Sequence, residues 1–248
     1  VIRSELLLDE GDPFTNLSLD KSIANIKSRN IFGLVKTDVV GGSANNLKII
    51  NINVEEKPTG EISAGAGIGT NGGSFAFNVQ ENNWLGQGKN VSFDVQLSAA
   101  SLQGTLKYTD PNYDFLGNAV SYYVTSSTND KSKQGYKNKI AGAGVRTSFE
   151  QYKDIIASIG ISATYDDLTT NDAASESLRK QGGSFNEIAG AYGFSYDTRD
   201  RSFMPTSGSI IGFSQSLPIY ADKSFVSNTI KASTYKSIGE DIIGGTKF

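Results

Sequence analysis

The stretch Ile155-Ile-Ala-Ser-Ile-Gly-Ile-Ser-Ala-Thr-Tyr165 decides the fold, because apolar side chains alternate along it with small or polar ones. A period of two predicts a β-strand with one apolar face and one polar face. The same pattern recurs around Phe75, Val91 and Ile188. From Gly60 onward no long segment has a helical period, so we expect an all-β antiparallel sheet there.

Turn residues divide this region into eleven expected strands, most of them close to the ~9–11 residues that cross a bilayer. They cover residues 61–69, 73–81, 90–98, 102–109, 117–126, 137–148, 154–166, 185–196, 208–217 and 224–236, with an eleventh that begins near 242. Compact connections alternate with variable ones, and the two long connections, 127–136 and 167–184, fall in the same set. Short turns at one rim and longer loops at the other are typical of outer-membrane barrels. Within the longer loop, residues 175–180 are expected to form a helical turn.

A soluble sandwich also has alternating strands, but its polar face meets bulk water and is usually rich in Lys and Glu. Here the polar face is mostly Ser, Asn, Thr, Gln, Gly and Ala, and aromatic residues such as Tyr108 gather near strand ends. Both features favour a transmembrane barrel. Lys107 and Arg146 are expected to face its interior and to pair with Asp94 or Glu187.

The composition excludes several kinds of chemistry. The 248 residues include no Cys and no His, which rules out disulfides, thiolate zinc sites and a Ser-His-Asp triad. The net charge of −3 gives no indication of nucleic-acid binding. No run of 18 apolar residues could form a transmembrane helix. We therefore expect no catalytic residues, no metal site and no cofactor.

Residues 1–57 differ from the remainder. Leu19, Ile23 and Ile26 predict a helix over 18–29, with Ser18 or Asp20 as its cap. Residues 1–8 are expected to be the tail of another helix, and residues 33–40 and 47–55 to be two strands of a hairpin. This is a small α+β module that lacks one strand for full cover of its helices.

Three connections carry more specific motifs. They are Asn83-Trp84-Leu85-Gly86-Gln87-Gly88, then Thr109-Asp110-Pro111, and then Asp197-Thr198-Arg199-Asp200-Arg201-Ser202-Phe203-Met204-Pro205-Thr206-Ser207-Gly208. Each resembles a periplasmic turn of the BamA family of outer-membrane β-barrel assembly factors. The resemblance is carried by Trp84, Gly86, Gly88, Asp110, Pro111, Asp197, Arg199, Asp200, Phe203, Pro205 and Gly208.

The leading module also resembles a part of this family. Glu10-Gly11-Asp12-Pro13-Phe14 and Ile31-Phe32 are similar to a POTRA domain, and Glu55-Glu56-Lys57-Pro58 to the junction with the barrel. The resemblance implies a POTRA-like periplasmic module at 1–57 without its first strand, followed by the N-terminal part of the barrel at 58–248. It places candidate partner contacts at Arg29, Phe32 and Lys36.

The resemblance implies a function without covalent chemistry. A family member folds and inserts β-barrel clients in the outer membrane of a Gram-negative bacterium. Its partners are unfolded client proteins, accessory periplasmic lipoproteins, outer-membrane lipid and lipopolysaccharide, and not nucleic acid. The protein is not expected to be an enzyme.

The first barrel strand is the candidate lateral gate, where client strands are templated by strand addition. It comprises Ile62, Ala64, Gly65, Ala66, Gly67, Ile68 and Gly69, and its glycines weaken strand pairing. Gly67 to Gly72 also matches the dinucleotide pattern G-x-G-x-x-G. That interpretation requires a helix after the glycines, whereas residues 73–79 predict another strand, so a glycine-rich hairpin is favoured.

The family barrel has sixteen strands, and about ten to eleven are present here, so roughly 100 residues are missing by the family's spacing. We therefore expect an incomplete, unclosed sheet from a fragment. Three alternatives stay open: a POTRA-containing transporter of the translocation-assembly or two-partner secretion type, a passive diffusion porin, and a barrel fused to a lipase-like enzyme domain. A porin is disfavoured by residues 1–57, and no G-x-S-x-G element is present.

Overall fold

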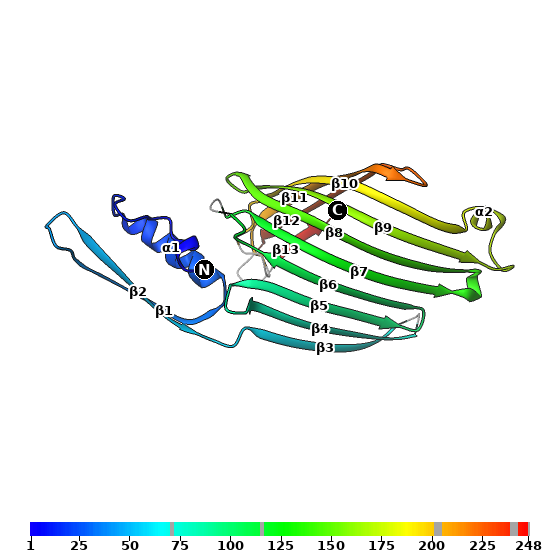
Figure 1. Cartoon of the computed structure of the whole chain (residues 1–248), viewed down its shortest axis with the longest axis horizontal. Helices are drawn as coiled ribbons and strands as arrows, with labels where there is room; N and C mark the ends of the chain where they lie inside the picture. The colour runs from blue at the N-terminus through cyan, green and yellow to red at the C-terminus, as the bar shows by residue number, and fades with distance from the viewer. Residues whose placement is uncertain (70–71, 115–116, 201–204, 239–242, 248) are drawn as a thin grey trace.

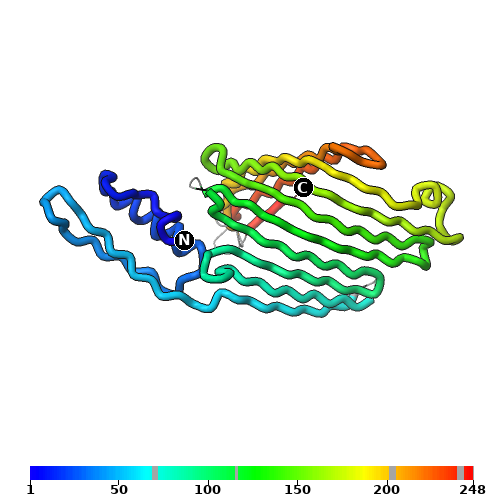
Figure 2. The backbone as a smooth tube through the Cα atoms, viewed as in Figure 1, coloured from blue at the N-terminus to red at the C-terminus, as the bar shows by residue number. Residues whose placement is uncertain are grey.

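The computed structural model describes residues 1–69, 72–114, 117–200, 205–238 and 243–247. An N-terminal helix and hairpin lie beside one end of a large curled sheet (Figure 1). The sheet has eleven antiparallel strands in the order β13-β12-β11-β10-β9-β8-β7-β6-β5-β4-β3, so every strand pairs with its neighbour in sequence. The backbone trace follows this meander without a crossover (Figure 2).

The strands of the large sheet match the expected set in number and order, which confirms the eleven-stranded meander. Their bounds are β3 Gly60–Gly69, β4 Gly72–Trp84, β5 Lys89–Ser98, β6 Ser101–Asp110, β7 Ala119–Lys131, β8 Tyr136–Tyr152, β9 Ile155–Thr170, β10 Gly183–Asp197, β11 Gly208–Ala221, β12 Ser227–Ser237 and β13 Ile243–Lys247.

Three strands extend further than predicted toward the rim with the long loops. β7 continues to Lys131, β9 to Thr170 and β11 to Ala221, so these connections are shorter than predicted. The β7 and β9 extensions are mostly polar, and polar strand residues have the same composition as a loop. The β11 extension begins with Pro218, which is more typical of a turn. The helical turn expected at 175–180 is present as α2, Glu176–Arg179.

The two long connections pack against each other at this rim. The backbone N–H of Asn171 donates to the carbonyl of Gly135 at 2.9 Å, and its side chain donates to the carbonyl of Ser132 at 2.9 Å. A Cβ at Gly135 would lie 2.1 Å from the backbone nitrogen of Ala174. Only glycine permits this approach, which couples the β7–β8 and β9–β10 connections.

The N-terminal module, residues 1–57, contains α1 (Asn16–Ser28) and the antiparallel hairpin β1–β2, with β1 at Phe32–Gly41 and β2 at Lys48–Glu56. Ile26 and Ile31 are fully buried between helix and hairpin. Ser22 is also buried, and its hydroxyl accepts from Leu7 N–H while donating to the Ser18 carbonyl. The buried Ser thus ties the N-terminal segment to the helix.

Two predictions for this module are wrong in detail. α1 is capped by Thr15, whose hydroxyl accepts from the Ser18 N–H at 3.1 Å, and not by Ser18 or Asp20. Residues 1–8 contain only a 3₁₀ turn, Arg3–Glu5, and not the tail of an α-helix. No helix in the described part of the chain has both the length and the apolar character to cross a membrane.

The two faces of the large sheet differ as the alternation predicts. Paired residues point to the same side of an antiparallel sheet, so Leu106, Val124 and Ala163 belong to one apolar face. On the other face Tyr123 lies over Gly144, where a Cβ would meet the Tyr hydroxyl at 2.5 Å. A glycine therefore provides the space that this inward aromatic ring occupies.

Candidate functional site

The edge strand β3 pairs with β4 alone among the described strands, which leaves its other side without a backbone partner. The opposite edge of the sheet is β13, so the sheet is not closed. Ile62 and Ile68 are 74% and 95% exposed, and no atom lies within 4 Å of a Cβ built at Gly65. An edge of this kind can accept an additional strand.

All the residues predicted for the gate strand lie on β3. In register with β4, Ile62, Ala64, Ala66 and Ile68 share one face, while Gly65 and Gly67 belong to the other. Gly72 begins β4 with a φ of +98°, so the G-x-G-x-x-G stretch leads from strand to strand. This arrangement confirms the favoured glycine-rich hairpin, because the dinucleotide interpretation needs a helix at that point.

The turn between β4 and β5 has the tight backbone that its glycines indicate. Leu85, Gly86 and Gly88 have φ values of 54°, 72° and 67°. The Asn83 side-chain oxygen accepts from the Gly88 N–H at 2.7 Å, and Trp84 is 44% exposed beside the turn. A side-chain acceptor and left-handed residues together fix this turn.

The second turn begins at Asp110-Pro111. The Asp110 carboxylate accepts from the Asn112 N–H at 3.2 Å and lies 3.4 Å from the Lys89 ammonium of the preceding strand. Asp114 accepts from the side chain of Asn118, and its other oxygen accepts from the Asn118 N–H at 3.0 Å. These acidic residues therefore stabilise the turn on which they lie.

The third turn joins β10 to β11, and the carboxylates of Asp197 and Asp200 form hydrogen bonds within it. Asp197 forms a bidentate pair with Arg199, with distances of 2.9 Å to Nε and 2.7 Å to Nη2. This pairing raises the pKa of Arg199 above its usual value. Asp200 accepts from Thr206 N–H, Thr206 Oγ1 and Ser207 N–H at 2.9, 2.6 and 3.1 Å.

Gly208 and Pro205 complete this turn. Gly208 has a φ of +94°, and a Cβ there would lie 2.2 Å from the Thr198 carbonyl oxygen, so only glycine fits. Pro205 is buried, and Phe203 lies outside the described residues. The charges of the motif serve the turn itself, and their predicted role as family turn residues stays a prediction.

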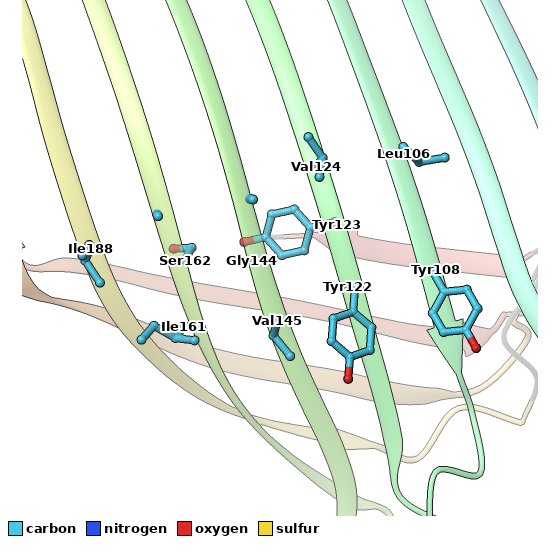
Figure 3. A pocket seen from close by; sticks show the side chains of 12 residues that line it. Leu106, Tyr108, Tyr122, Tyr123, Val124, Gly144, Val145, Ile161, Ser162 and Ile188 are labelled. Carbon is cyan, nitrogen blue, oxygen red and sulfur yellow. The ribbon is translucent and has the colours of Figure 1, made fainter.

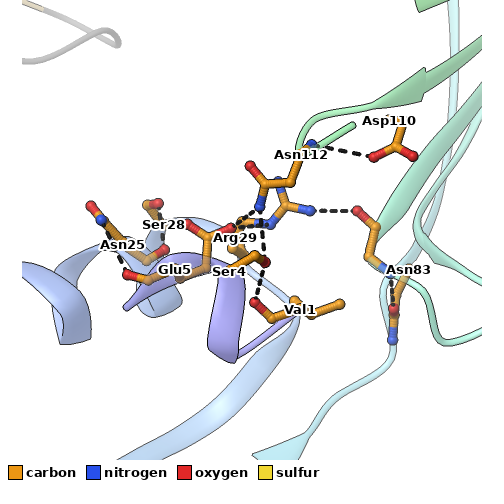
Figure 4. Close-up of polar contacts among 10 residues, drawn as sticks. Val1, Ser4, Glu5, Asn25, Ser28, Arg29, Asn83, Asp110 and Asn112 are labelled. Atoms are coloured by element: carbon orange, nitrogen blue, oxygen red, sulfur yellow. Dashed lines mark hydrogen bonds and ion pairs between the residues drawn. The ribbon is translucent and has the colours of Figure 1, made fainter. Parts of the chain in front are cut away.

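Arg29 lies where the N-terminal module meets these turns (Figure 4). Its Nη2 donates to the Gly88 carbonyl at 2.5 Å, and its Nε lies 3.4 Å from the Glu5 carboxylate without hydrogen-bond geometry. Glu5 in turn accepts from the Asn112 side chain at 2.5 Å. One guanidinium and one carboxylate thus join the module to the first and second turns.

The other candidate partner residues lie on β1. Phe32 is half-buried and lines a hollow between the module and the first turn, together with Val1, Val54 and Gly86. Lys36 is exposed. Arg29 has partners within the chain, so the structure does not bring these three residues together as one free surface, and their contact with another protein stays a prediction.

Sequence analysis did not identify Glu5, Asn83 and Asn112 as contact residues. The Asn112–Glu5 bond joins residues 107 positions apart, and the Arg29–Gly88 bond joins residues 59 apart. A period or a local motif carries no signal for contacts of this range. In the described part of the chain no group of three or more metal-ligating side chains exists.

The outer face carries a wide apolar belt. Tyr108 and Tyr122 lie side by side on neighbouring strands, with Leu106 and Val124 further from the short turns (Figure 3). The ring centroids of Tyr108 and Tyr122 are 6.2 Å apart. Leu106, Val124 and Ile161 are 50%, 57% and 51% exposed. Water-soluble proteins rarely expose contiguous apolar surface on this scale, and tyrosines beside such a belt are typical of a membrane interface.

The meander, the outward apolar belt and the specialised short turns together point to one kind of protein. The sequence profile of the Omp85 superfamily domain matches residues 83–248. The chain belongs to the Omp85/BamA family. This membership confirms the family resemblance, and the three turn motifs all lie within the matched residues.

Curated relatives agree with the assignment. The chain is 26% identical over 242 residues to "Outer membrane protein assembly factor BamA" of Neisseria meningitidis serogroup B, covering 90% of this chain and 30% of the relative. It is 24% identical to the protein of the same name from Neorickettsia risticii, covering 96% and 33%. The chain thus spans about a third of the length of these relatives.

Solved structures share the fold. BamA from Haemophilus ducreyi lacking POTRA domains 1–3 superposes with a TM-score of 0.78 at 19% identity, over 100% of this chain and 52% of that one. CdiB from Acinetobacter baumannii superposes with a TM-score of 0.55 at 12% identity, over 99% and 48%. The first of these likenesses extends through the whole chain, including the N-terminal module.

Proposed function

We propose that this chain is the working part of an outer-membrane assembly factor, which folds and inserts β-barrel clients by templating their strands on the free edge of β3. The observation that carries the proposal is the glycine-bearing first strand of an outward-apolar meander of the Omp85/BamA family, which pairs with β4 on one side. A client strand added to β3 would provide hydrogen-bond partners for its backbone N–H and C=O groups, which the bilayer interior cannot provide. The reaction needs no covalent chemistry, because client folding itself supplies the driving force.

In this proposal residues 1–57 are a POTRA-like module in the periplasm and residues 58–248 belong to the barrel. The short turns then form the periplasmic rim, since the module contacts them through Arg29 and Glu5. Accessory lipoproteins would bind the module, lipid and lipopolysaccharide would surround the apolar belt, and clients would enter beside β3. The helix and hairpin of the module, with a buried seam at Ile26 and Ile31, support this assignment.

A cross-linking experiment tests the site of templating. Residues 1–248 contain no Cys, and any Cys elsewhere in the complete gene product is replaced by Ser, so that Ser63→Cys on β3 introduces a unique thiol. The matched control is Ser148→Cys on β8, which has the same residue type on the same face but lies on a strand paired on both sides. With a client carrying a Cys in its last strand, we expect disulfide trapping at position 63 and not at 148. Equal trapping at both positions would contradict templating on β3.

A kinetic experiment tests the role of the weak edge. Gly65→Val and Gly104→Val both add a β-branched side chain where no atom lies within 4 Å of the new Cβ, so both are sterically accommodated. Gly65 lies on the edge strand and Gly104 within the sheet on β6. We expect Gly65→Val to slow client folding into liposomes several-fold and Gly104→Val to leave it unchanged. If the wild-type gene product itself did not accelerate client folding, the proposal would be wrong.

The transporter alternative rests on the fold shared with CdiB, and it predicts secretion of a dedicated partner without client insertion. The same liposome assay separates the two, because a transporter would not accelerate the folding of unrelated barrels. The porin alternative is separated by conductance, since a passive pore carries ions in the absence of any client.

A further inference from the structure

The concave face of the sheet contains a hollow of about 370 Å³ whose lining includes three cations. They are Lys107 on β6, Arg146 on β8 and Lys231 on β12, and all three side chains are exposed. No carboxylate lines this hollow.

The ion pairs predicted for these cations are absent from the described residues. None of the ion pairs there involves Lys107 or Arg146. Asp94 accepts instead from the Asn78 side chain at 2.6 Å. In register, Asp94 and Glu187 lie in the same row of side chains, nearer the long-loop rim than Lys107 and Arg146. The prediction failed because carboxylates and cations occupy different rows.

The spacing of the three cations selects the shape of a ligand. Measured along the sheet, Lys107 and Arg146 are two strands and two residues apart, roughly 12 Å, and Lys231 lies four strands and four residues further, roughly 23 Å. A single phosphate or carboxylate can bridge Lys107 and Arg146 but is too small to reach Lys231 as well. An extended peptide advances about 3.3 Å per residue, so about ten residues would pass all three.

The remaining lining suits a peptide backbone. Six hydroxyls line the hollow between the cations, and each can both donate and accept a hydrogen bond: Ser121, Ser148, Ser158, Ser195, Ser214 and Thr229. Gly193 and Gly212 also line the hollow and add no side chain to it. A charge-complementary strip with adaptable hydroxyls fits an extended chain that carries several carboxylates.

We infer that this basic hollow binds an acidic extended segment of a client chain as the client folds beside the sheet. The inference rests on the proposed function, and it adds a preference to it: clients with an acidic segment are retained better than clients without one. Lys107, Arg146 and Lys231 determine this preference.

Binding is tested with synthetic peptides added to the complete gene product in detergent, so client insertion is not needed. The probe is a fluorescent ten-residue peptide of alternating Ser and Glu, and its matched control has Gln in place of Glu. The triple variant Lys107→Gln/Arg146→Gln/Lys231→Gln should bind the acidic peptide about tenfold more weakly, from three solvent-exposed ion pairs. Removing three cations elsewhere, with Lys133→Gln/Lys153→Gln/Lys236→Gln, should leave affinity unchanged.

Charge reversal protects the test from misfolding. The variant Lys107→Glu/Arg146→Glu/Lys231→Glu should lose the Ser-Glu peptide and gain affinity for the matched Ser-Lys peptide, a gain that an unfolded protein cannot produce specifically. Equal affinity of the wild type for the Gln and Glu peptides would overturn the inference, as would competition by inorganic phosphate at equal concentration. Peptide binding without liposome activity would refute the proposed function while leaving the peptide site intact, and insertion without peptide binding would refute only the site.

Discussion

Replacing Arg29 with Met should release the N-terminal module from the short-turn rim. Met retains most of the apolar stem but removes the donor to the Gly88 carbonyl and the partner of the Glu5 carboxylate. The Arg29 and Glu5 side chains are 15% and 12% exposed, so little solvent is available to replace these interactions. The substitution therefore leaves a largely buried carboxylate without its cation.

The expected magnitude follows from this burial. Removing one partner of a fully buried pair costs about 3–5 kcal/mol, and an exposed pair is worth about 0–1 kcal/mol. Glu5 keeps its bond from Asn112, which reduces the penalty. We expect a loss of about 2 kcal/mol of docking free energy, or roughly a 30-fold shift from docked to undocked module. Adding Glu5→Gln to the Arg29→Met variant should restore about 1 kcal/mol of docking free energy, because the buried negative charge without a cation is then removed.

Distances between spin labels measure this equilibrium directly. The sequence has no Cys, so labels at Lys48→Cys in the hairpin and Lys153→Cys in the β8–β9 turn are unique. The wild type should give one narrow distance distribution, Arg29→Met a broad one, and the double variant an intermediate one. Lys36→Met is the control for loss of an exposed cation. If Arg29→Met gave the wild-type distribution, the ion pair would not hold the module and the reasoning would be refuted.

Three further outcomes are expected. Gly208→Val should destabilise the barrel domain by more than about 2 kcal/mol, since its φ is +94° and its Cβ would clash with backbone, and urea unfolding in detergent measures it; an unchanged midpoint would refute the turn geometry. Val124→Arg on the outer belt should cost about 2–4 kcal/mol in a bilayer, whereas Thr125→Arg on the inner face should cost little; equal costs would refute the assignment of faces. Asp200→Ala removes three hydrogen bonds that the carboxylate accepts and should cost about 2–3 kcal/mol of folding free energy. Asp200→Asn should retain part of them, so hydrogen exchange at the Ser207 amide should be slower in the Asn variant than in the Ala variant.

Much of the large sheet could be predicted because its signals are local. Alternation along Ile155 to Tyr165 gives both the strand and its two faces, and short turns between successive strands require an antiparallel meander. The motif glycines were also predictable, since Gly88 and Gly208 need positive φ values. Strand ends were less predictable at the long-loop rim, where polar strand residues have no apolar partner to reveal the period.

The candidate site was predicted in part. The glycine-bearing strand Gly60–Gly69 was found from its composition, and its predicted place as the first strand of an unclosed sheet is confirmed by the strand order. Arg29 was singled out as a partner contact, whereas the structure adds the contacts to Gly88 and Glu5. These contacts join segments that are distant along the chain, and no local pattern encodes them.

The sequence by itself determined the number, order and two-faced character of the strands, because each depends on neighbours within one hairpin. The tertiary structure alone decided two things: that the N-terminal module rests on the short turns, and that Lys107 and Arg146 face a hollow without carboxylates. Each depends on the curl of the sheet and on the register accumulated over many strands. Small offsets in the register of successive strand pairs add up and determine which charged side chains lie close together. The pattern of residues along one strand does not contain this accumulated offset.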